Sequence, residues 1–352
     1  MQEIEPEEEM SENAPTTPEA PATPPRKRRR WLKILLISVA VVVVGAVAAS
    51  AAYIYSIDKS VTQNIKRQDI LPAETPTAPG QSARPSADPE ATGAMNFVLL
   101  GSDSRDPGDA GAGRSDSIMV VHLNKAHDQA YITSFPRDMW VDIPGHGKGK
   151  INAAFAYGGT QLMVQTLESL LGTRMDHVVM VDFEGFMKLT DSLGGVTVNN
   201  KNAFSSHGFD YPKGEITIAG EEALWFVRER KSLPNGDLDR AENQRMVIKA
   251  IVAKGLSPEI VANPTAFTGF ISGVAEHVTV DSSLSDQTIR DLALSLRLTP
   301  SDIHLLQAPI SGFGTSPDGQ SIDIVDEAQL AALGKAMKKD TMVAYVEKYG
   351  DK

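Results

Sequence analysis

Short apolar runs alternate with longer amphipathic stretches between residues 95 and 340 of this chain. Runs rich in Val, Ile and aromatic residues predict strands over residues 95–101, 118–123, 130–135, 177–183, 196–199 and 303–306. Apolar residues at helical spacing predict helices over residues 155–171, 186–193, 220–227, 240–254, 284–296 and 326–338. Strands mixed with helices along one stretch indicate an α/β fold, in which helices cover a sheet.

The first three predicted strands look hairpin-linked, because no helix is predicted between them. Hairpins make antiparallel pairs, whereas helical crossovers make parallel ones. We therefore expect a single three-layered α/β/α domain over residues 95–340, with a mixed central sheet.

A second kind of apolar pattern precedes this domain. Residues 34–57 carry no charge, and these 24 residues would span about 36 Å as a helix, against a hydrocarbon core of about 30 Å. The basic residues 26–30 before the run favour a cytoplasmic N-terminus. The competing interpretation is a cleaved signal peptide, because small residues occur at 48–52, but the run is longer than a typical signal core.

The remaining segments lack apolar periodicity. Residues 1–31 are rich in Glu, Pro, Ala and Thr up to the basic cluster, which predicts a disordered cytoplasmic tail. We expect a transmembrane signal anchor over 32–57, a Pro-rich linker over 58–94 and a short C-terminal tail over 341–352. This arrangement predicts a single-pass protein of the cell membrane, in contact with membrane lipid, whose folded domain lies outside the cytoplasm.

Composition narrows the function. The net charge of −11, with no basic stripe outside the N-terminal tail, argues against a nucleic-acid partner. The chain has no cysteine, which excludes disulfides and thiolate metal sites.

Charged residues gather where the first predicted strand ends and the second begins. Asp103 and Arg105 follow the first strand, and Arg114 and Asp116 precede the second. If adjacent strands anchor the loop between them, the two aspartates come together, and a divalent cation removes their repulsion. Oxygen ligands suit magnesium, with manganese as the alternative. The competing interpretation is an Asx-turn at Asp103 and solvated loop aspartates.

Two further clusters follow later elements. Arg137 and Asp138 come after the third predicted strand, and Arg228 and Arg230 come after the predicted helix over 220–227. Arg137 has a structural alternative, an ion pair that locks its own loop.

The next predicted helix begins with charged residues. Arg240 and Gln244 share a face of its first turn, where free N–H groups favour anions. Asp239 with Glu242 also fits a capping box, which is the structural alternative for Asp239.

Taken together, these clusters combine many arginines with a few aspartates. Arginine forks match phosphate oxygens, and a pyrophosphate needs several such contacts and a metal. This composition is typical of a phosphoryl-transfer site. The candidate pyrophosphate ligands are Arg105, Arg114, Arg137, Arg228, Arg230, Arg240 and Gln244.

Four segments, in this order and spacing, resemble the LytR-CpsA-Psr family: NFVLLGSDSR, GRSDSIMVVHLN, TSFPRDMWVDIPG and FVRERKSLPNGDLDRAENQ. The resemblance covers roughly residues 95–340. Members transfer phosphoglycans, such as teichoic acids, capsule or arabinogalactan, from polyprenyl-pyrophosphate carriers to peptidoglycan.

The resemblance implies roles for individual residues. It implies that Asp103 and Asp116 hold magnesium, and that the lipid tail lies in a hydrophobic tunnel between sheet and helices. The residues that it places around the pyrophosphate are Arg105, Arg137, Arg228, Arg230 and Gln244. We expect Arg105 and Arg137 to stabilise charge during transfer, and Asp239, or else Asp138, to accept the proton of the attacking hydroxyl.

Two other functions use the same residues. A hydrolase would cleave the pyrophosphate with water as the acceptor. A membrane-anchored binding or regulatory module would hold the ligand without chemistry.

Overall fold

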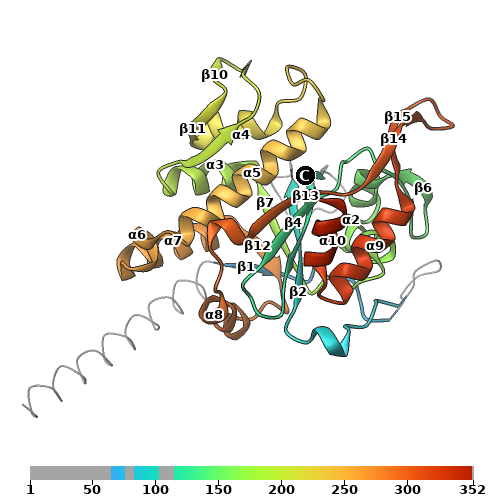
Figure 1. The fold of residues 1–352 in the computed structure, drawn as a ribbon, viewed down its shortest axis with the longest axis horizontal. Helices are drawn as coiled ribbons and strands as arrows, with labels where there is room; N and C mark the ends of the chain where they lie inside the picture. The colour runs from blue at the N-terminus through green and yellow to red at the C-terminus, as the bar shows by residue number, and fades with distance from the viewer. Residues whose placement is uncertain (1–64, 76–82, 103–114, 351–352) are drawn as a thin grey trace, which may run out of the picture. The chain divides into compact units, whose positions relative to one another are not determined.

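The structure, a computed structural model, describes residues 65–75, 83–102 and 115–350 (Figure 1). The predicted cytoplasmic tail over 1–31 and membrane anchor over 32–57 lie outside the described residues. Within the described ranges, no helix combines the length and the apolar character needed to cross a bilayer.

A seven-stranded sheet forms the centre of the domain, in the order β1-β12-β7-β2-β3-β4-β13. Its strands are β1 (Lys66–Gln68), β2 (Met95–Ser102), β3 (Ser115–Leu123), β4 (Ala130–Ser134), β7 (His177–Asp182), β12 (Thr279–Asp281) and β13 (Ile303–Gln307). The pairs β2–β3, β3–β4 and β7–β12 are antiparallel, whereas β2–β7, β4–β13 and β1–β12 are parallel. The predicted mixed sheet, with a hairpin-linked start, is therefore confirmed.

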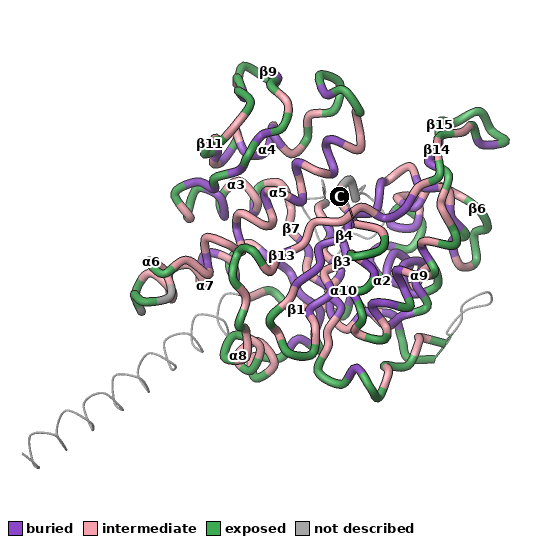
Figure 2. Tube along the Cα trace, viewed as in Figure 1, coloured by how far each residue is buried: buried purple, intermediate pink, exposed green. Residues whose placement is uncertain are grey.

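Helices cover both faces of this sheet (Figure 1). One face carries α2 (Ile151–Leu171), α9 (Glu327–Lys338) and α10 (Met342–Tyr349), and the other carries α5 (Asp237–Gly255), α7 (Pro264–His277) and α8 (Asp286–Ser295). Alternation along β2 explains the two faces: Val98 and Leu100 pack with α2 and α9, whereas Leu99 packs towards α5. Figure 2 shows buried positions along the central strands and on α2 and α9. The result is the three-layered arrangement that the apolar pattern predicts.

A second apolar cluster supports the segment between β7 and α5. Its elements are α3 (Phe183–Ser192), β8 (Val196–Asn200), β9 (Phe204–Ser206), β10 (Phe209–Tyr211), β11 (Gly214–Ile218) and α4 (Gly220–Arg228). The fully buried rings of Tyr211 and Phe226 pack with Phe204 and with Val247 of α5. This cluster fixes the C-terminal end of α4 against the first turns of α5.

Several short elements have no clear signal in the sequence pattern. They are η1 (Pro89–Ala91), β5 (Trp140–Ile143), β6 (Gly147–Lys150), α6 (Pro258–Val261), η2 (Pro300–Asp302), β14 (Ile310–Thr315) and β15 (Ser321–Val325). Predicted helix ends also shift: α2 begins four residues before the expected 155, and non-helical angles at Gly158 and Gly159 kink it. Gly159 has φ of 60°, a conformation that favours glycine.

The predicted domain limits of 95 and 340 are too narrow. Strand β1 belongs to the central sheet, and the Arg84 side chain, 3% exposed, forms an ion pair of 2.8 Å with Glu168 of α2. Parts of the expected linker over 58–94 are therefore docked on the domain. The expected tail over 341–352 contains α10, whose Met342 and Tyr345 are buried. Composition alone predicts a linker here, because it cannot show contacts between residues far apart in the sequence, such as those of Arg84 with Glu168 and of β1 with β12.

Candidate functional site

A cavity of about 400 Å³ opens between the sheet and the helices on the α5 side. Strands β2, β3 and β7 form its floor, and α3, α4, α5 and α7 form its walls. Most of the lining is apolar: Leu99, Leu100, Met119, Val179, Val181, Phe183, Phe186, Leu189, Leu224, Val227, Ile248, Ile251 and Val274. Such walls suit a hydrocarbon chain.

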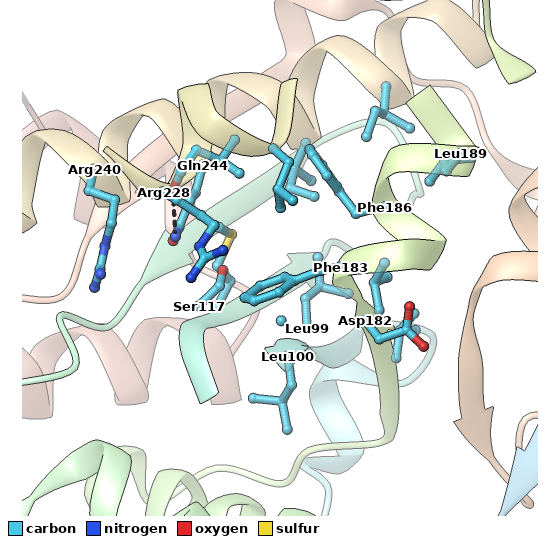
Figure 3. A pocket seen from close by; sticks show the side chains of 18 of the residues that line it. Leu99, Leu100, Ser117, Asp182, Phe183, Phe186, Leu189, Arg228, Arg240 and Gln244 are labelled. Carbon is cyan, nitrogen blue, oxygen red and sulfur yellow. Dashed lines mark hydrogen bonds between the residues drawn. The ribbon is translucent and has the colours of Figure 1, made fainter. Parts of the chain in front are cut away.

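Polar side chains line the same cavity. They are Arg137, Arg228, Arg230, Arg240 and Gln244, together with Ser117 and Asp182. Five of the seven predicted pyrophosphate ligands therefore converge, although they come from the loop after β4, the end of α4 and the start of α5. The other two, Arg105 and Arg114, lie outside the described residues. Figure 3 shows Arg228, Gln244 and Arg240 along one side of the cavity, with Phe183 beside Arg228.

Packing and one hydrogen bond position Arg228 and Gln244. The guanidinium carbon of Arg228 lies 4.5 Å from the ring centre of Phe183 and 5.0 Å from that of Trp225. Gln244 Nε2 donates to the carbonyl oxygen of Val227 at 3.2 Å, which ties α5 to the end of α4 (Figure 3). Aromatic faces attract a guanidinium and leave its N–H edges for a ligand.

Asp237 connects two of the arginines. Its Oδ1 lies 2.5 Å from Arg240 Nη2 and 3.5 Å from Arg137 Nε. Burial raises the pKa of Asp237 above its ordinary value, although both arginines act to lower it. A carboxylate between the two guanidinium groups offsets their mutual repulsion before a ligand arrives.

Arg137 also takes part in the ion pair that the sequence left as its structural alternative. Its Nε lies 3.7 Å from Asp138 Oδ2, while Asp138 Oδ1 lies 2.8 Å from Lys150 Nζ. Because Arg137 lines the cavity as well, the two interpretations coexist.

Asp239 is engaged in the turn before α5. Its Oδ2 accepts from the Asn235 amide at 2.8 Å and its Oδ1 from the Asn235 side chain at 3.0 Å. The helix is capped by Gly236, so the predicted capping box of Asp239 with Glu242 is wrong; Glu242 pairs with Lys201 instead. Both carboxylate oxygens of Asp239 are thus engaged with Asn235, which favours a structural role over proton transfer.

The β2–β3 ladder ends at residues that adjoin the predicted metal ligands in the sequence. Ser102, the last residue of β2, pairs with Ser115, and the register shifts between this pair and the preceding Gly101–Ser117 pair. Asp116 lies at this irregular position in β3, and its side chain is outside the description, as is all of Asp103. Gly101 and Ser117 line the cavity, so this end of the ladder opens into it. Among the described side chains, no three metal-binding residues form a cluster.

Asp182 is a site residue that the sequence interpretation missed. It lies opposite Ser102 in the parallel pair β2–β7, lines the cavity, and accepts from the Gly185 amide at 2.6 Å as the cap of α3. The sequence pattern could have predicted Asp182, because it is an acidic residue at the carboxyl end of an apolar strand, which was also the reason for selecting Asp103. Asp237 had a weaker signal, since its partner Arg137 lies 100 positions earlier.

Comparisons with known proteins identify the family and support the fold. The LytR_cpsA_psr family matches residues 52–339. The polyisoprenyl-teichoic acid–peptidoglycan teichoic acid transferase TagU of Enterococcus faecalis is 36% identical over 245 residues, covering 69% of this chain and 78% of the relative. The crystal structure of Bacillus subtilis TagV matches with a TM-score of 0.61 and 27% identity, over 71% of this chain and 97% of that chain. A structure of TagT bound to LI-WTA matches with a TM-score of 0.57 and 27% identity, over 77% and 99%.

Proposed function

Because the chain belongs to the LytR-CpsA-Psr family, we propose that it transfers a phosphoglycan from a polyprenyl-pyrophosphate carrier to a sugar hydroxyl of peptidoglycan. Polyprenyl phosphate is the second product. One observation carries the proposal: a single cavity combines apolar walls with four arginines. Apolar walls suit the lipid and arginines suit the pyrophosphate, so both parts of one donor are accommodated. The relatives named as teichoic acid transferases support a teichoic-acid-type glycan; capsule and arabinogalactan types are the alternatives.

In the proposed reaction, the hydroxyl oxygen attacks the glycan-side phosphorus. The bond from that phosphorus to the bridging oxygen breaks, and the bridging oxygen leaves with polyprenyl phosphate. Arg228, Arg230 and Arg240 would bind the phosphate oxygens, with Gln244 as a further donor. Arg137 would stabilise the charge that develops as the bond breaks, together with Arg105. Positioning and charge neutralisation supply most of the catalysis in such transfers.

The hydroxyl proton needs an acceptor. Of the two residues selected from the sequence, Asp138 fits better, because its side chain is 26% exposed and adjoins Arg137 of the cavity. Asp239, whose two oxygens accept from Asn235, fits worse.

We propose that Asp103 and Asp116 hold magnesium, or manganese in its place. The pairing of Ser102 with Ser115 supports this, because Asp103 and Asp116 each adjoin one member of the pair, and carboxylate oxygens are the donors that magnesium prefers. Asp182, opposite Ser102, adds a further carboxylate nearby. When bound, the ion neutralises charge on the two phosphates.

The predicted membrane anchor fits the proposed substrates. A lipid carrier stays in the bilayer, so a single-pass chain with its N-terminus in the cytoplasm would hold the domain close to donor and acceptor on the outer side.

The test uses the full-length chain with a polyprenyl-pyrophosphate-linked glycan, a peptidoglycan oligosaccharide and magnesium chloride. Mass spectrometry should detect the glycan phosphate joined to the oligosaccharide and an equal amount of polyprenyl phosphate. Polyprenyl phosphate without the joined product would show a hydrolase instead. Donor binding without either product would show a binding module. Chelation of the metal should stop transfer, and added magnesium should restore it.

A further inference from the structure

An aromatic stack continues outward from Arg228, away from the cavity. The imidazole of His207 lies against the indole of Trp225, with ring centres 3.4 Å apart and planes within 7° of parallel. His207 is exposed, in the turn between β9 and β10, whereas Trp225 is half-buried on α4. Neither residue belongs to the cavity lining.

Arg228 contacts the same indole. Its guanidinium carbon lies over the Trp225 ring, 5.0 Å from the ring centre. Phe183 contacts the same guanidinium at 4.5 Å and lines the cavity. The guanidinium thus contacts two aromatic rings, and a third ring, that of His207, stacks on one of them.

Hydrogen bonds fix the outer layer to the arginine segment. Ser206 Oγ donates to Glu229 Oε2 at 2.6 Å and lies 3.0 Å from His207 Nδ1. Glu229 Oε1 accepts from the amides of Arg230 and Ser232 at 2.9 and 3.0 Å. Although burial acts to raise it, these hydrogen bonds lower the pKa of Glu229 to about 2. The β9–β10 hairpin is therefore joined, through Glu229, to the segment that carries Arg228 and Arg230.

We propose that Trp225, backed by His207, is a positioning residue that holds Arg228 in the orientation that binds a pyrophosphate. An exposed arginine has many rotamers, and ordering it on binding costs affinity. Two cation–π contacts, with Phe183 and Trp225, restrict the guanidinium beforehand. The inference rests on the proposed function, since it assigns Arg228 to the pyrophosphate.

The test measures the dissociation constant of geranylgeranyl pyrophosphate, with magnesium chloride, for the full-length chain and for Trp225→Leu. Leucine keeps apolar bulk and helix propensity but removes the aromatic face. The dissociation constant should rise about 3- to 30-fold, the range that cation–π contacts span. Trp225→Phe should recover most of the affinity. Tyr157→Leu is the matched control, because Tyr157 is also stacked on a histidine, His146, at 4.8 Å, but outside the cavity lining.

A double-mutant cycle separates positioning from simple stability. In an Arg228→Gln background, Trp225→Leu should weaken binding by less than twofold, because the group that it positions is gone. An equal loss in both backgrounds would mean that Trp225 only stabilises the fold, and the proposal would be overturned. Unchanged binding by the single Trp225→Leu variant would also overturn it.

A second variant keeps the test decisive if Trp225→Leu does not fold. His207→Asn removes the outer ring, and asparagine tolerates the φ of 52° found there. It should weaken binding two- to threefold with Arg228 present and not with Arg228→Gln; equal effects would reject the proposal. If the wild-type chain binds no geranylgeranyl pyrophosphate, the proposed function fails and the role of the stack fails with it. If wild type binds and the variants bind equally well, only the role of the stack fails.

Discussion

The two kinds of wall in the cavity are built in different ways. The apolar walls come from regular positions of strands and helices, such as Leu99 of β2 and Ile248 of α5, whose neighbours form the core. The polar wall comes from the ends of elements, where Arg137, Arg228 and Arg240 approach from three parts of the chain.

The two kinds of wall differ in what a substitution removes. Truncating an apolar wall residue mainly removes favourable transfer free energy, roughly 0.8 kcal/mol per buried methylene. A charged residue of the polar wall has a compensating partner, as Arg137 and Arg240 have in Asp237. Changes at the polar wall should therefore have larger and less additive effects than changes at the apolar wall.

The largest effect is expected at the polar wall, from Arg228→Gln. It should lower kcat/KM for glycan transfer by about 100-fold or more, because a preorganised charged donor to the transition state is lost. The measurement is the rate of glycan attachment to the oligosaccharide acceptor. The control is Lys188→Gln on the neighbouring helix α3. It removes the positive charge of a side chain that is 57% exposed, and the variant should keep full activity. Similar losses in both variants would mean that overall charge, not the site, governs transfer.

A smaller effect is expected from Ile248→Phe at the apolar wall. The added bulk should displace part of the lipid and weaken binding of a polyprenyl-pyrophosphate donor about tenfold, corresponding to about two methylenes. Inorganic pyrophosphate should bind as it does to wild type, which also controls for folding. If both ligands lose affinity equally, the apolar wall does not contact the lipid.

Asp323, beside Asp138 and Asp237, should make the free energy of unfolding depend on pH. Burial, and then the nearby carboxylates of Asp138 and Asp237, raise the pKa of Asp323 from 3.8 to about 6. Between these pH values the folded state binds the proton that the unfolded state has lost, so stability falls as pH rises through this window. The loss above pH 6 should be about 1–3 kcal/mol.

Asp323→Asn should remove this loss. Its melting temperature should exceed that of wild type by a few degrees at pH 8 and match it near pH 4, as scanning calorimetry would measure. Asp318→Asn is the control on the same hairpin, because hydrogen bonds from Ser316 and Gln320 lower the pKa of Asp318. It should give no gain at pH 8. A gain in both variants would attribute the effect to net charge.

The sequence predicted the layered sheet and most of the arginine cluster for different physical reasons. Strand and helix periodicity reports local burial, so β2 and α5 were found within a few residues of their ends. The convergence of Arg137 with Arg240 depends on the tertiary fold. Periodicity could not predict it, and the two residues were assigned to one site only from the chemistry of phosphate binding and the family resemblance. Docking of β1 was missed because its three residues are polar and pair with Thr279–Asp281, which lie far away in the sequence. Docking of α10 was missed although its Met342, Tyr345 and Val346 pack into the core.

The stack of His207 on Trp225 also had no sequence signal, since a hairpin brings together two residues that lie 18 positions apart. The capping-box interpretation of Asp239 failed for another reason: the chain makes a turn at Asn235 and begins α5 at Asp237, so the residue that looked like a cap sits inside the first turn. Local spacing could not fix the helix start to within two residues.

The smallest effect is therefore expected from Asp239→Asn. If Asp239 only closes the turn, asparagine keeps one acceptor oxygen, so kcat for glycan transfer should fall less than threefold while stability falls by about 1 kcal/mol. Asp138→Asn is the comparison, because Asp138 adjoins the cavity arginine Arg137. If Asp138 is the proton acceptor, this substitution should lower kcat at least tenfold. Transfer rates at saturating donor, with calorimetric melting as the second readout, separate the two roles. If Asp239→Asn lowers kcat at least 100-fold at unchanged stability, the proton acceptor is Asp239 and the turn contacts are its positioning partners.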